Sequence, residues 1–375
     1  MKRNDGIDIL RAVAVLSVLL THIGTYNPSG IIGKSLNDIL IFLNNNLIWA
    51  NQGLHGGVII FIVVSGFCIH MGNKSIVNKN FLKIYTIRRF FRIYPLLIFA
   101  IILGYIVVIV SKSTYQDIFA EDIIFLHSNL LFKDFLLNFL SSIFLFYSVL
   151  PTAPPLGNAI LGTVIVECML YAFYPPIIKI LNDRWKILIF FLFILHIMSF
   201  SLIYFTSIEP TWVQRNFFTV ALYWWLGAYS AELILSNKMN DNTELTKKNK
   251  IFISFLIWIF YISFSNIFDF KGSHVIKSLI LAILISQLLT WVILIKQKQN
   301  LLIKIFVFIG TISYSIYAIQ FPISYLFQVY LLKFEYIQYF YIISYIGIFI
   351  TSYICYLLIE RPSHNYGKSL SKNFI

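Results

Sequence analysis

Apolar runs of about 18–22 residues recur along this sequence, and they limit the possible fold more than any other feature. A helix of this length crosses about 30 Å of hydrocarbon. The strands of a membrane barrel are instead alternating segments of about ten residues. Hydrophobic residues make up 59% of the chain and charged residues 12%, whereas about 25% of a soluble domain is charged. The sequence therefore predicts an all-α membrane protein.

We predict a bundle of about ten transmembrane helices. The predicted spans are about residues 7–25, 54–71, 93–111, 158–179, 187–206, 215–236, 251–268, 277–295, 304–331 and 337–359. Segment 135–149 is apolar but short, and prolines follow it, so we interpret it as a re-entrant or interfacial piece. Since no polar stretch is long enough for a separate domain, residues 1–375 are expected to form a single membrane-embedded domain.

Positive charge is distributed unevenly between the two predicted sides of the membrane. About three-quarters of the Lys and Arg residues fall at the helix ends that share a side with the N-terminus. This bias predicts that both termini are cytoplasmic, and it explains the net charge of +13 without a nucleic-acid partner. The three cysteines lie in separate apolar runs, so neither a disulfide framework nor a metal site is predicted.

The first span contains three ionisable residues, which are expensive inside a membrane and therefore candidates for function. Asp8, Arg11 and His22 lie on one helix face at 100° per residue, and Asp8 can pair with Arg11 at i, i+3. A neutral imidazole can act as a general base near pH 7. The alternatives are a structural ion pair for Asp8 and Arg11, and an interfacial packing role for His22.

Three arginines precede the third predicted span. Arg89 and Arg92 are three residues apart and share a helix face, and Arg88 adds a third charge. Two guanidinium groups placed in this way suit phosphate groups, so the sequence favours an anionic ligand here. The positive-inside bias alone is the alternative explanation.

The fourth predicted span contains a carboxylate in its outer half. Thr163, Glu167 and Tyr171 recur every four residues and form a polar stripe on one helix face. Glu167 is thus either a functional carboxylate or a structural one that is hydrogen-bonded inside the bundle.

Taken together, these motifs resemble the acyltransferase 3 family of bacterial membrane O-acyltransferases, which includes O-antigen and Nod-factor acetyltransferases. The resemblance runs from Ile7 to Pro362. The motifs that carry it are Asp8-Ile9-Leu10-Arg11 with His22, Gly57-Val58 with Ser65-Gly66-Phe67, Arg88 to Pro95, Gly310 to Tyr317, and Glu360-Arg361-Pro362. Two departures are that Cys168 stands where the family usually has a second acid, and that Gln320 replaces a common histidine.

The resemblance implies that an acyl group, usually acetyl from acetyl-CoA or another acyl-CoA, is transferred to a hydroxyl of a cell-surface sugar or lipid-linked glycan. It places the protein in the bacterial inner membrane, among membrane lipids and without a metal cofactor. Arg89 and Arg92 would hold the donor phosphates, with Arg88 adding to the positive field, and the pantetheine arm would extend between the helices towards Arg11 and His22.

The resemblance also implies roles for the remaining site residues. His22 would take the acceptor proton or first accept the acyl group, and Glu167 would orient the acceptor or His22. Tyr314, Arg215 and Tyr171 are the candidates for sugar binding. A polysaccharide or lipid-linked sugar transporter is the alternative from another functional class, and a non-catalytic assembly partner is a third; the sequence leaves the oligomeric state open.

Overall fold

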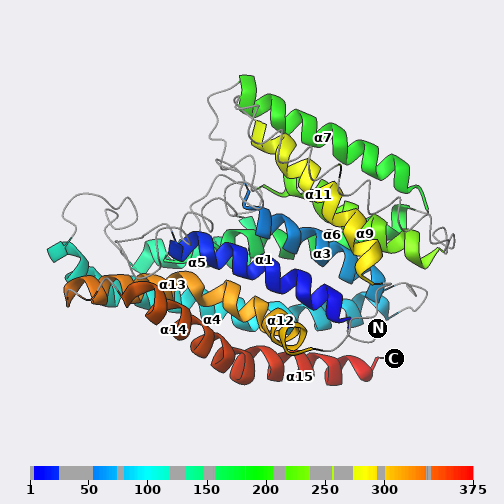
Figure 1. Cartoon of the computed structure of the whole chain (residues 1–375). Coiled ribbons are helices and arrows are strands. Elements are labelled where there is room, and N and C mark those ends of the chain that lie inside the picture. The colour runs from blue at the N-terminus through cyan, green and yellow to red at the C-terminus, as the bar shows by residue number, and fades with distance from the viewer. Residues whose placement is uncertain are drawn as a thin grey trace. The chain divides into compact units, whose positions relative to one another are not determined.

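The computed structural model describes most of the chain, and its described residues form helices and no strand. These residues are 4–24, 54–73, 80–118, 132–146, 155, 157–181, 183–205, 216–236, 256, 273–293, 300–334, 336 and 339–374. The helices fall into two compact units, described separately below (Figure 1). Two helices, α1 (Asp5–Gly24) and α6 (Leu161–Leu181), contribute their first and second parts to different units.

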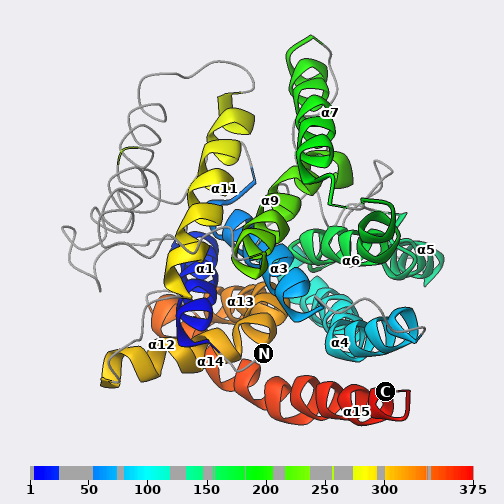
Figure 2. The same cartoon turned by 90° about the vertical axis from the view of Figure 1, so that its right-hand side faces the viewer.

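The first unit is built around the pair α3 (Gly56–Gly72) and α9 (Phe217–Leu235), which lie side by side (Figure 2). Glycines permit this close crossing, as in many membrane helix pairs. A Cβ on Gly66 would lie 1.9 Å from the carbonyl oxygen of Trp224, and one on Gly227 would lie 2.0 Å from that of Val63. The other helices of this unit are α7 (Trp185–Phe205), α11 (Ser273–Val292) and α12 (Leu301–Thr311).

The second unit contains α4 (Phe81–Ile118), and α13 (Ser313–Lys333) packs against it. Asn158 is fully buried, and its Nδ2 donates to the carbonyl oxygens of Ala100 on α4 and Ala318 on α13. The remaining elements of this unit are α5 (Phe132–Ile143), α14 (Phe340–Cys355), the π-helical turn η4 (Tyr356–Glu360) and α15 (Arg361–Lys372).

Six of the described helices are long and apolar enough to cross a membrane, and a seventh span results if α12 and α13 count as one. The predicted multi-pass helical architecture is therefore confirmed, while the count of ten remains a prediction. The predicted span 251–268 lies outside the described residues, apart from Leu256. The predicted span 304–331 is interrupted at Ile312, where the helix breaks sharply between α12 and α13.

Two helices extend beyond the predicted membrane spans, and for the same physical reason. The third span was expected to start near residue 93, but α4 begins at Phe81. The last was expected to end near residue 359, but a continuous helical segment runs on to Lys372. Apolar windows detect only the part of a helix that is rich in hydrophobic residues, whereas the backbone stays helical through the polar residues next to it. Segment 135–149 overlaps the short helix α5, and its last three residues lie outside the described part of the chain; its placement at the membrane interface remains a prediction.

Candidate functional site

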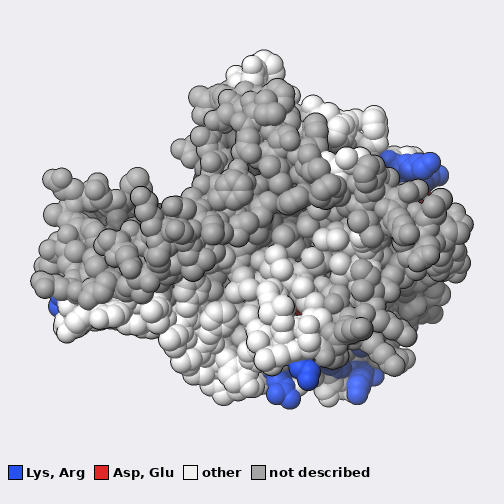
Figure 3. Space-filling view, viewed as in Figure 1, with Lys and Arg blue, Asp and Glu red and all other residues white. Residues whose placement is uncertain are grey.

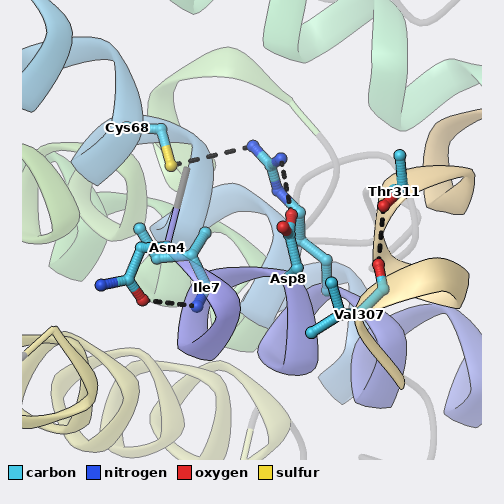
Figure 4. Close-up of polar contacts among 7 residues, drawn as sticks. Asn4, Ile7, Asp8, Cys68, Val307 and Thr311 are labelled. Carbon is cyan, nitrogen blue, oxygen red and sulfur yellow. Dashed lines mark hydrogen bonds and ion pairs between the residues drawn. The ribbon is translucent and has the colours of Figure 1, made fainter. Parts of the chain in front are cut away.

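The Asp8–Arg11 ion pair forms as predicted, within the first unit. Arg11 Nη1 lies 3.9 Å from Asp8 Oδ1, and Arg11 Nη2 donates to Cys68 Sγ on α3 at 3.7 Å. Asp8 is buried, and Gly310 on α12 fits against its backbone, since a Cβ there would lie 1.9 Å from the Asp8 carbonyl oxygen. Figure 4 shows the three helices converging, with Asp8, Cys68 and Thr311 as labelled side chains. The contact between Gly310 and the Asp8 backbone thus connects the motif that contains Asp8 with the motif that begins at Gly310.

His22 lies in the last turn of α1 and belongs to the second unit. Its ring meets the ring of Phe321 edge-on, with 6.3 Å between the ring centroids. The neighbouring Gln320 is only 1% exposed, and its Oε1 is buried without a hydrogen-bond partner in the described part of the chain. Gln320 is the residue that replaces a common family histidine, so the departure from the family pattern is next in sequence to the ring that packs against His22.

The predicted polar stripe on α6 exists and contacts two other helices of its unit. The Tyr171 hydroxyl donates to Glu167 Oε1. Tyr85 on α4 donates its hydroxyl to the Tyr171 carbonyl oxygen at 3.0 Å. Thr163 Oγ1 and the Tyr317 hydroxyl on α13 are 2.5 Å apart. Glu167 is half-buried, so the stripe keeps one carboxylate in a hydrogen-bonded but partly accessible position.

Tyr314 lies at the start of α13 and is half-buried. Its hydroxyl donates to the carbonyl oxygen of Ile93 on α4 at 3.0 Å, and it lies within electrostatic range of Glu167 and Glu360. The next residue, Ser315, donates to Glu360 Oε2 at 2.6 Å. This bond joins the two late motifs, the one around Tyr314 and the one that begins with Glu360.

The three predicted arginines lie on the first turns of α4, where α15 packs against them. Arg88 Nε donates to Ser371 Oγ of α15 at 2.8 Å. Arg89 lies over the ring of Tyr85, 5.7 Å from its centroid. Arg92 acts electrostatically on His364 of α15. Together with α15, the arginines form a cluster of positive charge.

Several α15 residues next to this cluster were not predicted as site residues. The polar stretch after the last predicted span was expected only to be the cytoplasmic C-terminus. A signal was present in the sequence. His364, Lys368 and Ser371 are spaced by four and three residues, which places them on one face of a helix. That spacing would have identified a polar helix face, although not its partner.

A buried histidine network in the first unit was also missed. His70 Nε2 lies 2.8 Å from Glu232 Oε2, and its Nδ1 lies 2.9 Å from the Tyr174 hydroxyl. The ring of Trp185 packs edge-on against His70 at 4.9 Å. Both ring nitrogens of His70 therefore have partners, which suits a structural connection between α3, α6 and α9.

The compact units divide the predicted site residues into two groups. His22, Glu167, Tyr171, Tyr314 and the three arginines all belong to the second unit, whereas Asp8 and Arg11 belong to the first. Arg215 lies outside the described residues. In the described part of the chain, no three His, Cys, Asp or Glu side chains are grouped closely enough to hold a metal ion.

The apolar helices and the ionisable clusters on them define a multi-pass membrane protein. Its particular class follows from comparison with known families. The model described as "Acyltransferase domain" matches residues 4–361, nearly the whole chain. The chain therefore belongs to the acyltransferase 3 family, and the protein is an acyltransferase. Neither a curated protein nor a solved structure gives a significant match.

Proposed function

We propose that this enzyme transfers an acetyl group from acetyl-CoA, or another acyl group from its CoA thioester, to a hydroxyl of a cell-surface sugar or lipid-linked glycan precursor. The proposal places the protein in the bacterial inner membrane, with the whole chain acting as one membrane-embedded acyltransferase domain. The observation that carries it is the positive cluster on the first turns of α4. The donor is an anion, and Arg88, Arg89 and Arg92 offer guanidinium groups to its phosphates.

The proposed reaction needs one base and one leaving group. The acceptor hydroxyl oxygen attacks the thioester carbonyl carbon, so a C–O bond forms and the C–S bond breaks. The hydroxyl proton passes to the His22 imidazole, and the CoA thiolate leaves and takes up a proton. In the second route, the acyl group first moves to His22 and then to the hydroxyl. Both routes give the same products.

Glu167 and Tyr171 support this chemistry as a hydrogen-bonded pair in the same unit as His22. A half-buried carboxylate that is fixed by a tyrosine suits the orientation of a sugar hydroxyl or of His22. Tyr314 is proposed as a sugar contact through the acceptor lone pairs of its oxygen, because its proton is donated to Ile93. Arg215 is proposed as a further sugar contact. Asp8 and Arg11 are proposed as further catalytic residues.

His22→Ala tests the proposed function. We expect the loss of about 10²–10⁴-fold in acyl transfer, the usual contribution of a positioned acid or base. Transfer of labelled acetyl from acetyl-CoA into glycan is measured in membranes that contain equal amounts of the protein. His196→Ala is the control, because His196 is a buried histidine on another helix that packs against Tyr223 in the first unit.

Near wild-type transfer in His22→Ala would rule out both routes through this imidazole. Export of unmodified glycan by the wild-type protein, with no label incorporated, would instead support the transporter alternative. An equal loss in His196→Ala would show that any buried histidine is needed for folding.

A further inference from the structure

The C-terminal helix α15 is held against α4 by contacts that do not depend on its charges. A Cβ on Gly367 would lie 2.6 Å from Cβ of Phe91, so only glycine permits this approach. The rings of Phe91 and Tyr366 meet edge-on at 5.0 Å. Past the end of α15, Asn80 Nδ2 donates to the Phe374 carbonyl oxygen at 3.0 Å. Figures 1 and 2 show α15 along the start of α4.

The charges that meet at this contact are positive. The positive charges of Arg92, Lys368, Arg89 and Arg88 act on half-buried His364. The charged groups that act on it include no carboxylate of the described residues. Figure 3 shows Lys and Arg gathered along the lower edge of the molecule, where Figure 1 places α15. Because like charges repel, the packing of α15 maintains an arrangement that attracts an anion.

The donor groups of the cluster are also suited to an anion. Arg88 is fixed by its Nε bond to Ser371, and this bond does not use the two terminal nitrogens that pair with phosphate oxygens. Arg89 Nε is buried and has no hydrogen-bond partner among the described residues. A buried donor without a partner is costly, and a bound anion would remove that cost.

We infer that α15 completes the donor site, with His364 and Lys368 joining the three arginines of α4 to bind the phosphate groups of the acyl donor. The inference rests on the proposed function, in which the donor is an acyl-CoA. His364 and Lys368 are one helical turn apart, and His364 lies within electrostatic range of Lys368 and of all three arginines. Coenzyme A carries a diphosphate and a separate ribose phosphate, which matches the arginines of α4 together with the Lys368 ammonium and a His364 N–H donor on α15. His364 and Lys368 therefore act in donor recognition.

The inference is tested by steady-state kinetics of the purified full chain in lipid nanodiscs. The variants are His364→Gln, Lys368→Gln and the charge-preserving Lys368→Arg. Lys372→Gln is the matched control, because Lys372 is an exposed lysine on the same helix and does not act on His364. The two donors are acetyl-CoA and S-acetyl-N-acetylcysteamine, which has the same thioester but no phosphate.

We expect each Gln variant to raise KM for acetyl-CoA about tenfold to a hundredfold, the effect of one lost charge-assisted hydrogen bond, while kcat stays within about twofold. Lys368→Arg and Lys372→Gln should behave like the wild type. With the phosphate-free donor, all variants should match the wild type. An equal loss with both donors would overturn the inference and leave α15 a purely structural helix.

An anionic lipid headgroup offers the same phosphate chemistry, so the kinetics are repeated in neutral phosphatidylcholine and with added phosphatidylglycerol. An effect of Lys368→Gln that disappears in neutral lipid would assign the cluster to lipid and overturn the inference.

Calorimetry with adenosine 3′,5′-bisphosphate separates this test from the proposed function. If the wild type transfers no acetyl from acetyl-CoA, the proposed function fails. Nucleotide binding that weakens in Lys368→Gln would then still support the phosphate site, and no binding to the wild type would refute it.

Discussion

At the scale of single residues, the Glu167 carboxylate is fixed by its tyrosine partner. The carboxylate accepts a hydrogen bond from Tyr171 one turn along the same helix, and Tyr85 donates to the backbone at Tyr171. The orientation of the carboxylate is thus set from α6 itself and supported from α4. A carboxylate held in this way can accept a further hydrogen bond from a sugar hydroxyl without moving, and this suits an orienting role better than proton transfer.

Tyr171→Phe tests that role. Removing the hydroxyl leaves Glu167 in place but frees its rotation, so we expect kcat/KM for the glycan acceptor to fall about tenfold, the effect of one charge-assisted hydrogen bond. KM for the acyl donor should not change. Acceptor and donor titrations on the purified enzyme measure both. Tyr94→Phe is the control, since it removes the same group from a weak 3.4 Å bond to the Ile143 carbonyl oxygen. A rise in the donor KM alone would contradict the prediction.

Residue contacts differ in how far the sequence could predict them. Asp8 pairs with Arg11, and Glu167 with Tyr171, over three and four residues, so helical spacing alone was sufficient to predict them. His70 and Glu232 are 162 residues apart, and their contact depends on the crossing of α3 and α9. Local periodicity contains no information about which helices are neighbours, so this contact could not be predicted.

At the scale of helices, the motif Gly57-Val58 with Ser65-Gly66-Phe67 has a packing function. Gly66 lets α3 approach the backbone of α9, and Ser65 Oγ accepts a hydrogen bond from Trp224 Nε1 at 3.3 Å. This motif was grouped with the functional ones because it resembles a family pattern. Its residues form part of the helix contact at the centre of the first unit, and the described contacts explain them without a ligand.

Gly66→Val should therefore reduce the amount of folded protein severalfold. A Cβ at residue 66 would lie 1.9 Å from a backbone oxygen, and the two helices would have to separate. Gly72→Val is the matched control, because it lies at the end of the same helix and a Cβ there would have nothing within 4 Å. The measurement is the monodisperse fraction after detergent extraction, by size-exclusion chromatography. Equal recovery of the two variants would show that the α3–α9 contact tolerates expansion.

At the scale of the whole molecule, a single family model covers nearly all of the chain, and six of the described helices are long and apolar enough to cross a membrane. The sequence predicted this organisation because long apolar runs directly reflect the thickness of the bilayer. It predicted the helix ends less well, as α4 and α15 show, because polar helical turns have no apolar signal. These polar turns, α15 and the start of α4, are the ones that carry the positive cluster.

The orientation of the chain gives the last prediction. The charge bias predicts that both termini are cytoplasmic, which places the cluster of α4 and α15 on the side where acyl-CoA is available. Green fluorescent protein fused after Phe374 should therefore fluoresce, and alkaline phosphatase fused at the same position should be inactive. Fused after Phe334, at the end of α13, the same phosphatase should be active, because that helix end is predicted to lie outside.

Phosphatase activity at the C-terminal fusion would mean that the cluster faces away from the cytoplasm. A soluble acyl-CoA could not then reach it, and the donor would have to be a phosphorylated carrier on the outer side. The fusion experiment therefore tests the donor as well as the topology, because a phosphate site can bind only the anion that is present on its own side of the membrane.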